Sequence, residues 1–191
     1  QDFKMADKIK NPPTQEIATH AGGRDITQPY IGKLLINQDT VLSGRGGNLK
    51  IYDELLNDDQ VYSTFQQRRE AVVSKSWGVK PASDSPPDIE AAEFIEAMFK
   101  NLDFDDITRK AMFSVFYGYG IGEYMWAEEG GKWLINQIKM RDRTRFRFGP
   151  DRELYLITRN SPNGELMPDN KFWTISTGAS HDDAPYGLGL A

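Results

Sequence analysis

The stretch DFDDITRKAMFSVFYGYGIGEYMWAEEGGKWLINQIKM, residues 103–140, changes from a helical to a β pattern within one segment. Asp103 predicts a helix cap, and Gly118 predicts the end of that helix. The predicted buried side consists of apolar residues at helical spacing, Phe104, Ile107, Ala111 and Val115. Residues 121–127 and 133–140 then read as strands on either side of a Glu-Glu-Gly-Gly turn at 128–131. The stretch predicts a helix followed by an antiparallel hairpin, which indicates the α+β class.

The glycines at positions 118, 120 and 122 superficially resemble a nucleotide-binding loop. Such a loop leads from a strand into a helix, so that the phosphate meets the helix N-terminus. Here the order is reversed. We therefore interpret Gly118 to Gly122 as a tight helix-to-strand corner rather than a phosphate site.

The residues before this stretch predict three more helices. Residues 49–56 form a short helix, and Asp58 or Asp59 caps a longer one that ends near Trp77. Its apolar stripe is Val61, Phe65, Val72 and Val73, while Gln66, Gln67, Arg69 and Glu70 are expected to be solvated. The next helix begins at Pro87 or Asp88 and places Ile89, Ala92, Ile95 and Phe99 on one face.

The residues after it predict further strands at 145–148, 154–158 and 171–176, with a turn at 161–165. We expect an antiparallel β meander. The segment Ala184 to Ala191 has no polar tail, which predicts that the chain is truncated, and Met5 is a candidate natural start.

Residues 1–47 are rich in glycine and proline and show no sustained period, which predicts an extended N-terminal arm before an α+β domain at 48–191. Leu34 and Leu35 form a short apolar patch that docks on the body or on a neighbouring subunit, with core anchoring favoured. The stretch from Ser43 to Asn48 precedes a helix but lacks the Gly-Lys-Ser/Thr of a phosphate loop, so we favour a flexible joint.

Composition excludes several classes of function. The 191 residues contain 39% hydrophobic and 27% charged residues, which is typical of a globular protein. The absence of cysteine excludes disulfides and thiolate metal sites, and two histidines nearly exclude a multi-histidine site. A net charge of −5 disfavours tight nucleic-acid binding. No apolar run is long enough to span a bilayer, and the first residues do not resemble a secretory signal.

The strongest electrostatic feature is a run of alternating arginines, Arg141, Arg143, Arg145 and Arg147. If residues 141–147 are extended, the four guanidinium groups share one face. They then contact phosphates or, as we favour, pair with carboxylates on adjacent strands or subunits.

The triplet His181-Asp182-Asp183 is a weak candidate for a cation site or a base, and we interpret it as ordinary surface. No residues match a nucleophile, base and oxyanion arrangement. We therefore predict no catalytic residue, no metal ligand and no cofactor.

Taken together, several short segments are similar to the N-terminal portion of Mu-type bacteriophage and prophage portal proteins. The resemblance runs from about Arg24 to Ala191. The matching segments are Arg24-Asp25, 52–55, 58–61, 67–72, 77–79, 116–120, 123–126, 145–148, Pro168 with 171–172, and 185–190.

This resemblance implies a non-enzymatic subunit of a dodecameric ring at one capsid vertex, through which double-stranded DNA passes during packaging and ejection. It implies the major capsid protein, terminase and head-completion proteins as partners. It also implies location in the virion, with assembly in the host cytoplasm. The residues resemble the wing, so stem, clip and crown parts are expected to be missing. The candidate subunit or capsid interface consists of Arg141, Arg143, Arg145, Arg147, Arg24, Leu34 and Leu35.

Two alternatives remain open. One is a protein-interaction or scaffold domain that forms no ring. The other, which is less favoured, is a Mg²⁺-dependent nucleic-acid-processing enzyme, which would need carboxylates that converge in a cleft.

Overall fold

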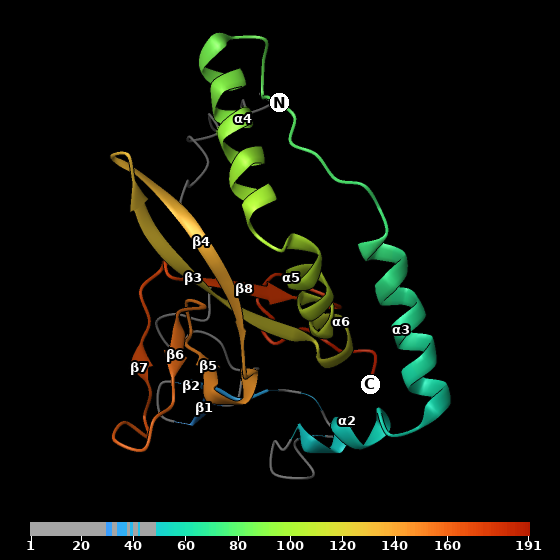
Figure 1. The fold of residues 1–191 in the computed structure, drawn as a ribbon. Helices are drawn as coiled ribbons and strands as arrows, with labels where there is room; N and C mark the ends of the chain where they lie inside the picture. Colours follow the sequence, from blue (N-terminus) through green and yellow to red (C-terminus); the bar gives the residue numbers. More distant parts are fainter. Residues whose placement is uncertain (1–29, 32–33, 38, 40–41, 43–48) are drawn as a thin grey trace, which may run out of the picture.

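A computed structural model describes residues 30–31, 34–37, 39, 42 and 49–191 of the chain (Figure 1). Arg24 and the stretch from Ser43 to Asn48 lie outside these described residues. Helices and antiparallel strands follow one another along the chain, which confirms the α+β class.

The first two helices are α2 (Lys50–Leu55) and α3 (Asp59–Val73). The side chain of Asp58 accepts hydrogen bonds from the backbone of Gln60 and Val61, which confirms the predicted cap. Helix α3 ends earlier than expected, at Val73 rather than near Trp77.

The predicted faces of α3 need a correction at Arg69. This residue is buried, with 7% of its surface exposed, and its guanidinium lies over the rings of Phe65 and Phe113. Aromatic faces attract a cation, and the long arginine stem is itself apolar. Val61 and Val72 of the expected apolar stripe are instead exposed.

Helix α4 (Pro86–Asn101) contains no fully buried residue. It begins at Pro86, one residue before the predicted start, and lies along strand β4 (Lys132–Arg141). Lys132 of that strand lies over the ring of Phe94 and pairs with Glu90. Figure 1 shows the long connection between α3 and α4 running outside the helices.

The predicted helix from Asp103 to Gly118 is divided into α5 (Phe104–Ala111) and α6 (Phe113–Tyr117). Asp103 caps α5 through a hydrogen bond from the backbone of Asp106, as predicted. Gly118 ends α6 with φ at +92°.

The hairpin consists of β3 (Tyr119–Glu129) and β4 (Lys132–Arg141). Gly130 and Gly131 form its turn with φ of +58° and +76°, a conformation that favours glycine. This confirms the predicted hairpin.

The strands do not form a single meander. Strands β5 (Phe146–Phe148), β6 (Leu154–Leu156) and β7 (Glu165–Leu166) make one small sheet. The last strand, β8 (Phe172–Ser176), instead returns to pair with β3 in a second sheet of order β4-β3-β8. The register joins Gly122 to Trp173, and a Cβ on Gly122 would lie 3.2 Å from the Trp173 ring, closer than an ordinary contact.

The arm contributes to the same core as the rest of the chain. Strands β1 (Tyr30–Ile31) and β2 (Leu34–Leu35) pair with each other, and β2 lies next to β5. Leu35 and Leu42 are each 1% exposed. The core consists of Leu35, Leu42, Leu49, Tyr52, Phe65, Phe116, Tyr119, Ile121, Phe146, Phe148, Leu154 and Tyr186.

The C-terminal segment, residues 184–191, wraps around the corner at Gly118. The amides of Leu190 and Ala191 donate to the carbonyls of Val115 and Phe116, at 3.1 and 3.3 Å. A Cβ on Gly118 would lie 2.7 Å from the carbonyl oxygen of Tyr186. The glycine is therefore required for a close backbone approach as well as for its positive φ, which supports the corner interpretation.

Candidate functional site

The segment from Arg141 to Arg147 is not one extended strand. Strand β4 ends at Arg141, a 3₁₀ turn η2 (Arg143–Arg145) follows, and β5 begins at Phe146. Asp142 caps this turn by accepting hydrogen bonds from both the backbone and the hydroxyl of Thr144. These bonds hold the pKa of Asp142 below its ordinary value. The premise that the four arginines share one face of a strand is therefore wrong.

Arg141 pairs across the hairpin. Its Nε donates to Oε2 of Glu123 at 2.7 Å, and Lys171 approaches the other oxygen of Glu123 at 3.8 Å. One carboxylate on β3 thus pairs with two cations, one from the segment on each side. This is the carboxylate pairing that the sequence favoured, and it lies within one chain.

Arg143 is half-buried and joins three elements. Its Nη1 donates to the carbonyls of Phe113 at 3.2 Å and Tyr119 at 2.9 Å, and its guanidinium lies 4.0 Å from the ring centre of Tyr117. Burial lowers the pKa of the guanidinium from its ordinary value. In return, the hydroxyl of Tyr119 donates to the carbonyl of Arg143 at 3.2 Å. Arg143 therefore fixes the start of α6 and of β3.

Arg147 and Arg145 differ in exposure. Arg147 is half-buried, and its Nη1 donates to the carbonyls of Thr144 and Phe146, at 2.9 and 2.7 Å. Arg145 is exposed, and its guanidinium forms no hydrogen bond or ion pair with a described residue, although its backbone bonds to Asp142 and Ile157. Of the four arginines, Arg145 alone keeps its guanidinium available within the part of the chain that the structure describes.

The other predicted interface residues lie in different environments. Leu35 is buried in the core of its own chain, which agrees with the core-anchoring alternative and leaves no exposed side chain for a neighbour. Leu34 is half-buried beside it. Arg24 lies outside the described residues.

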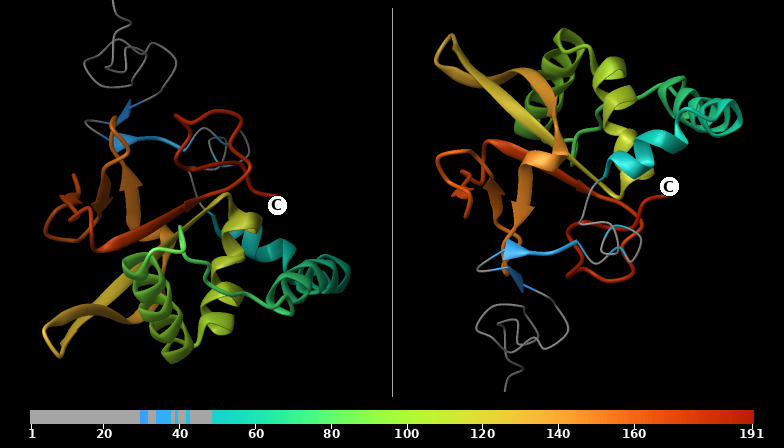
Figure 2. Two further views of the ribbon diagram at one scale, coloured as in Figure 1. Left: turned by 90° about the horizontal axis from the view of Figure 1, so that it is seen from above. Right: turned by 90° about the horizontal axis from the view of Figure 1, so that it is seen from below.

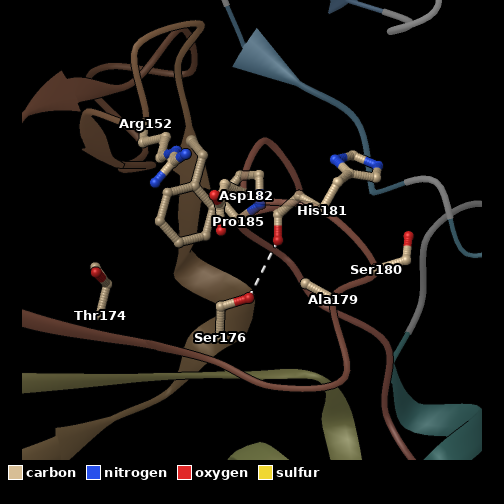
Figure 3. A pocket seen from close by; sticks show the side chains of 10 residues that line it. Arg152, Thr174, Ser176, Ala179, Ser180, His181, Asp182 and Pro185 are labelled. Atoms are coloured by element: carbon tan, nitrogen blue, oxygen red, sulfur yellow. Dashed lines mark hydrogen bonds between the residues drawn. The ribbon is translucent and has the colours of Figure 1, made fainter.

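The His181 triplet lies at the rim of a cavity of about 390 Å³ (Figure 3). Asp183 pairs with Arg152 at 3.8 Å, and Ser176 donates to the carbonyl of Ala184 at 3.1 Å. Figure 3 shows Arg152 and His181 on opposite sides of the opening. His181 and Asp182 are both exposed, as the surface interpretation expects.

Among the described residues, no three histidine or carboxylate side chains lie close enough together to hold a metal ion. No helix within residues 49–191 has the length and hydrophobicity to cross a membrane.

The sequence analysis missed an aromatic surface on the hairpin. Trp133 of β4 is 65% exposed, and Trp126 of β3 is 42% exposed with its Nε1 bonded to the carbonyl of Asn170. Both were assigned only as parts of strands. Two tryptophans near a polar hairpin turn could have predicted an interaction surface, because tryptophan is enriched at protein interfaces.

Comparison with known proteins identifies the class of protein to which this fold belongs. The family model described as the portal protein of Mu bacteriophage matches residues 49–191. The chain therefore belongs to this family of phage portal proteins, as the resemblance predicted. The family is structural rather than enzymatic, and its members assemble with capsid components in the virion. A search of curated protein sequences gave no match.

Proposed function

We propose that this chain is the wing part of a portal subunit. Twelve copies form a closed ring at one capsid vertex, and double-stranded DNA passes through the ring during packaging and ejection. The observation that carries this proposal is the family match over residues 49–191.

The charge of the chain supports passage rather than capture of DNA. The net charge is −5, and three of the four arginines in 141–147 bond to groups of the same chain. A protein that neutralises many phosphates binds DNA tightly and resists its movement. A ring of subunits with a net negative charge lets the duplex slide.

The proposed partners are the major capsid protein, terminase and head-completion proteins, beside further copies of the same chain. Assembly takes place in the host cytoplasm before the ring becomes part of the virion. A closed ring needs two different surfaces on each subunit, because each copy contacts a neighbour on either side. Arg145 is the candidate that remains from the predicted arginine interface.

The test is the native mass and the particle shape of the protein expressed from its complete reading frame. We expect a ring of about twelve copies with an axial hole, as cyclic symmetry allows. A monomer or dimer that persists across protein concentration and salt contradicts the ring and favours the scaffold alternative.

A further inference from the structure

None of the four tryptophans of this chain is buried. Trp77, Trp126 and Trp133 are 41%, 42% and 65% exposed, and Trp173 is half-buried. Tryptophan has the largest apolar surface of any side chain and is highly buried on average. Its exposure on several elements indicates that other molecules cover parts of this surface.

The hairpin tip combines two of these tryptophans with acidic residues. The register places Glu128 opposite Trp133, and Trp126 lies on the same face of β3 as Glu128. Glu129 follows at the turn, where alternation directs it to the opposite face, beside a cavity that Phe94 of α4 also lines. Glu128 and Glu129 are exposed, and neither forms an ion pair with a described residue. We call Trp126, Glu128, Glu129 and Trp133 the hairpin surface.

Helix α3 carries a surface of the opposite charge. Val61, Arg68 and Val72 are separated by seven and four residues, so these three lie along one side of the helix. Lys75 follows two residues after the last residue of the helix. Val61 is 36% and Val72 is 46% exposed. Arg68 and Lys75 are exposed and form no ion pair within the part of the chain that the structure describes. We call these four residues the α3 stripe.

The hairpin surface and the α3 stripe match each other in chemistry but lie far apart in one molecule. Each combines two apolar side chains with two unpaired charges, acidic on the hairpin and basic on α3. Figures 1 and 2 show the hairpin tip and α3 on opposite sides, with α4 and α5 between them. One copy therefore cannot bring its own two surfaces together without unfolding.

From this arrangement we infer that the hairpin surface of one copy packs on the α3 stripe of the next copy. The contact is heterologous: one surface meets a different surface on the neighbour, and the pairing continues from copy to copy. This inference rests on the proposed ring. It names the contact that closes the ring: Trp126 and Trp133 pack against Val61 and Val72, and Glu128 pairs with Arg68. Glu129 and Lys75 add opposite charges at the edges of this contact.

A second copy fits this site better than DNA or an unrelated protein. The hairpin carboxylates repel phosphates. A complementary basic and apolar stripe is already present on every copy of the same chain, at equal concentration. Opposite potentials across a contact also set which partner is chosen and in which orientation.

The absence of cysteine allows a direct test by engineered disulfides. The variants are Glu128→Cys in one sample and Arg68→Cys in another, both at exposed positions. After mixing and mild oxidation, we expect a covalent dimer from this pair. The matched control replaces Arg68→Cys with Asn163→Cys, an exposed turn residue outside both surfaces, and should give no dimer. A chain that carries both Glu128→Cys and Arg68→Cys should give a ladder of multimers.

The results separate this inference from the proposed function. If the protein forms rings but Glu128→Cys and Arg68→Cys do not cross-link, the named contact is wrong and the ring stands. If neither rings nor cross-links form, both the proposed ring and the contact between the hairpin surface and the α3 stripe are wrong. A disulfide between two copies of Glu128→Cys, or a cross-link as strong to Asn163→Cys, also overturns the contact.

Charge reversal provides a second measurement. Glu128→Arg with Glu129→Arg places like charges across the contact and should weaken self-association by roughly tenfold or more. Adding Arg68→Glu and Lys75→Glu to the same chain should restore it. Weakening without restoration indicates that these glutamates contact a different partner and contradicts the inference.

Discussion

The hydroxyl of Tyr186 donates a hydrogen bond of 2.8 Å to the carbonyl of Leu35, across 151 positions of sequence. The same hydroxyl accepts a bond from the amide of Phe148 at 3.2 Å. The ring of Tyr186 packs against Phe148 and Tyr119, with centroids 5.0 and 5.2 Å away. One tyrosine of the C-terminal segment therefore joins the arm, the small sheet and the long hairpin.

Tyr186→Phe should lower the free energy of unfolding by about 1–3 kcal/mol, because it leaves two buried backbone groups without their partner. Urea unfolding measures this. The control is Tyr62→Phe, since Tyr62 is 47% exposed and has no hydrogen bond to a described residue through its hydroxyl. Equal effects of the two changes would show that the Tyr186 hydroxyl does not hold the arm.

Gly118→Ala tests the close approach of the C-terminal segment. The added Cβ would lie 2.7 Å from the carbonyl oxygen of Tyr186, at a φ of +92°. Gly131→Ala is the matched control, because Gly131 also has a positive φ but no atom lies within 4 Å of its added Cβ. We expect Gly131→Ala to cost about 1 kcal/mol and Gly118→Ala roughly twice that or more. Thermal unfolding of both variants distinguishes crowding from the cost of the conformation alone.

The roles of the arginines separate in a pair of conservative substitutions. Arg143→Lys should lower stability by about 1–3 kcal/mol, because an ammonium group does not reproduce a planar guanidinium that bonds two carbonyls over an aromatic ring. Arg145→Lys should change it by less than about 0.5 kcal/mol, because that side chain is exposed. Denaturant midpoints check both. Similar losses of stability in the two variants would contradict the role of the Arg143 guanidinium in holding the start of α6 and of β3.

Stability should fall in alkali as Tyr52 ionises. Burial and the hydrogen bond to Asp39 raise the pKa of Tyr52 to about 12. The unfolded value is about 10. Because the pKa of Tyr52 is higher in the folded state, its contribution to the free energy of unfolding is complete below pH 10. This contribution is lost as the pH rises through about 12. Tyr52→Phe should flatten this part of the pH profile, which unfolding midpoints measured across this range would reveal.

Duplex DNA should bind weakly, and its affinity should depend little on Arg145. With a net charge of −5, the chain as a whole repels the phosphates of the duplex. Filter binding of the purified protein and of Arg145→Ala at several salt concentrations measures this. A tight, steeply salt-dependent affinity that Arg145→Ala abolishes would contradict a subunit past which DNA slides.

Local signals in the sequence predicted the elements that depend on neighbouring residues. Asp58 and Asp103 cap their helices as expected, because a cap acts within three residues. The hairpin turn at Gly130 and Gly131 was likewise predicted, since two-residue turns need positive φ. Sequence patterns also carried the family resemblance, which the family match confirms.

The arginine segment shows where such reasoning failed. Alternation of arginines fits a strand, but Asp142 and Thr144 form a turn that interrupts it. The burial of Arg69 between aromatic rings was equally hidden, because Phe113 lies 44 positions away in sequence. A charged side chain is buried only when distant residues supply a surface for it.

The sequence by itself determined the α+β class, the helix caps, the hairpin and the family, because each depends on short-range spacing or on the order of local segments. The tertiary structure alone decided that β8 pairs with β3, that Arg69 is buried beside aromatic rings, and that the C-terminal segment closes around Gly118. These contacts join residues far apart in the chain. Such contacts form between surfaces that become complementary only when the whole chain folds, and no local sequence pattern predicts this complementarity.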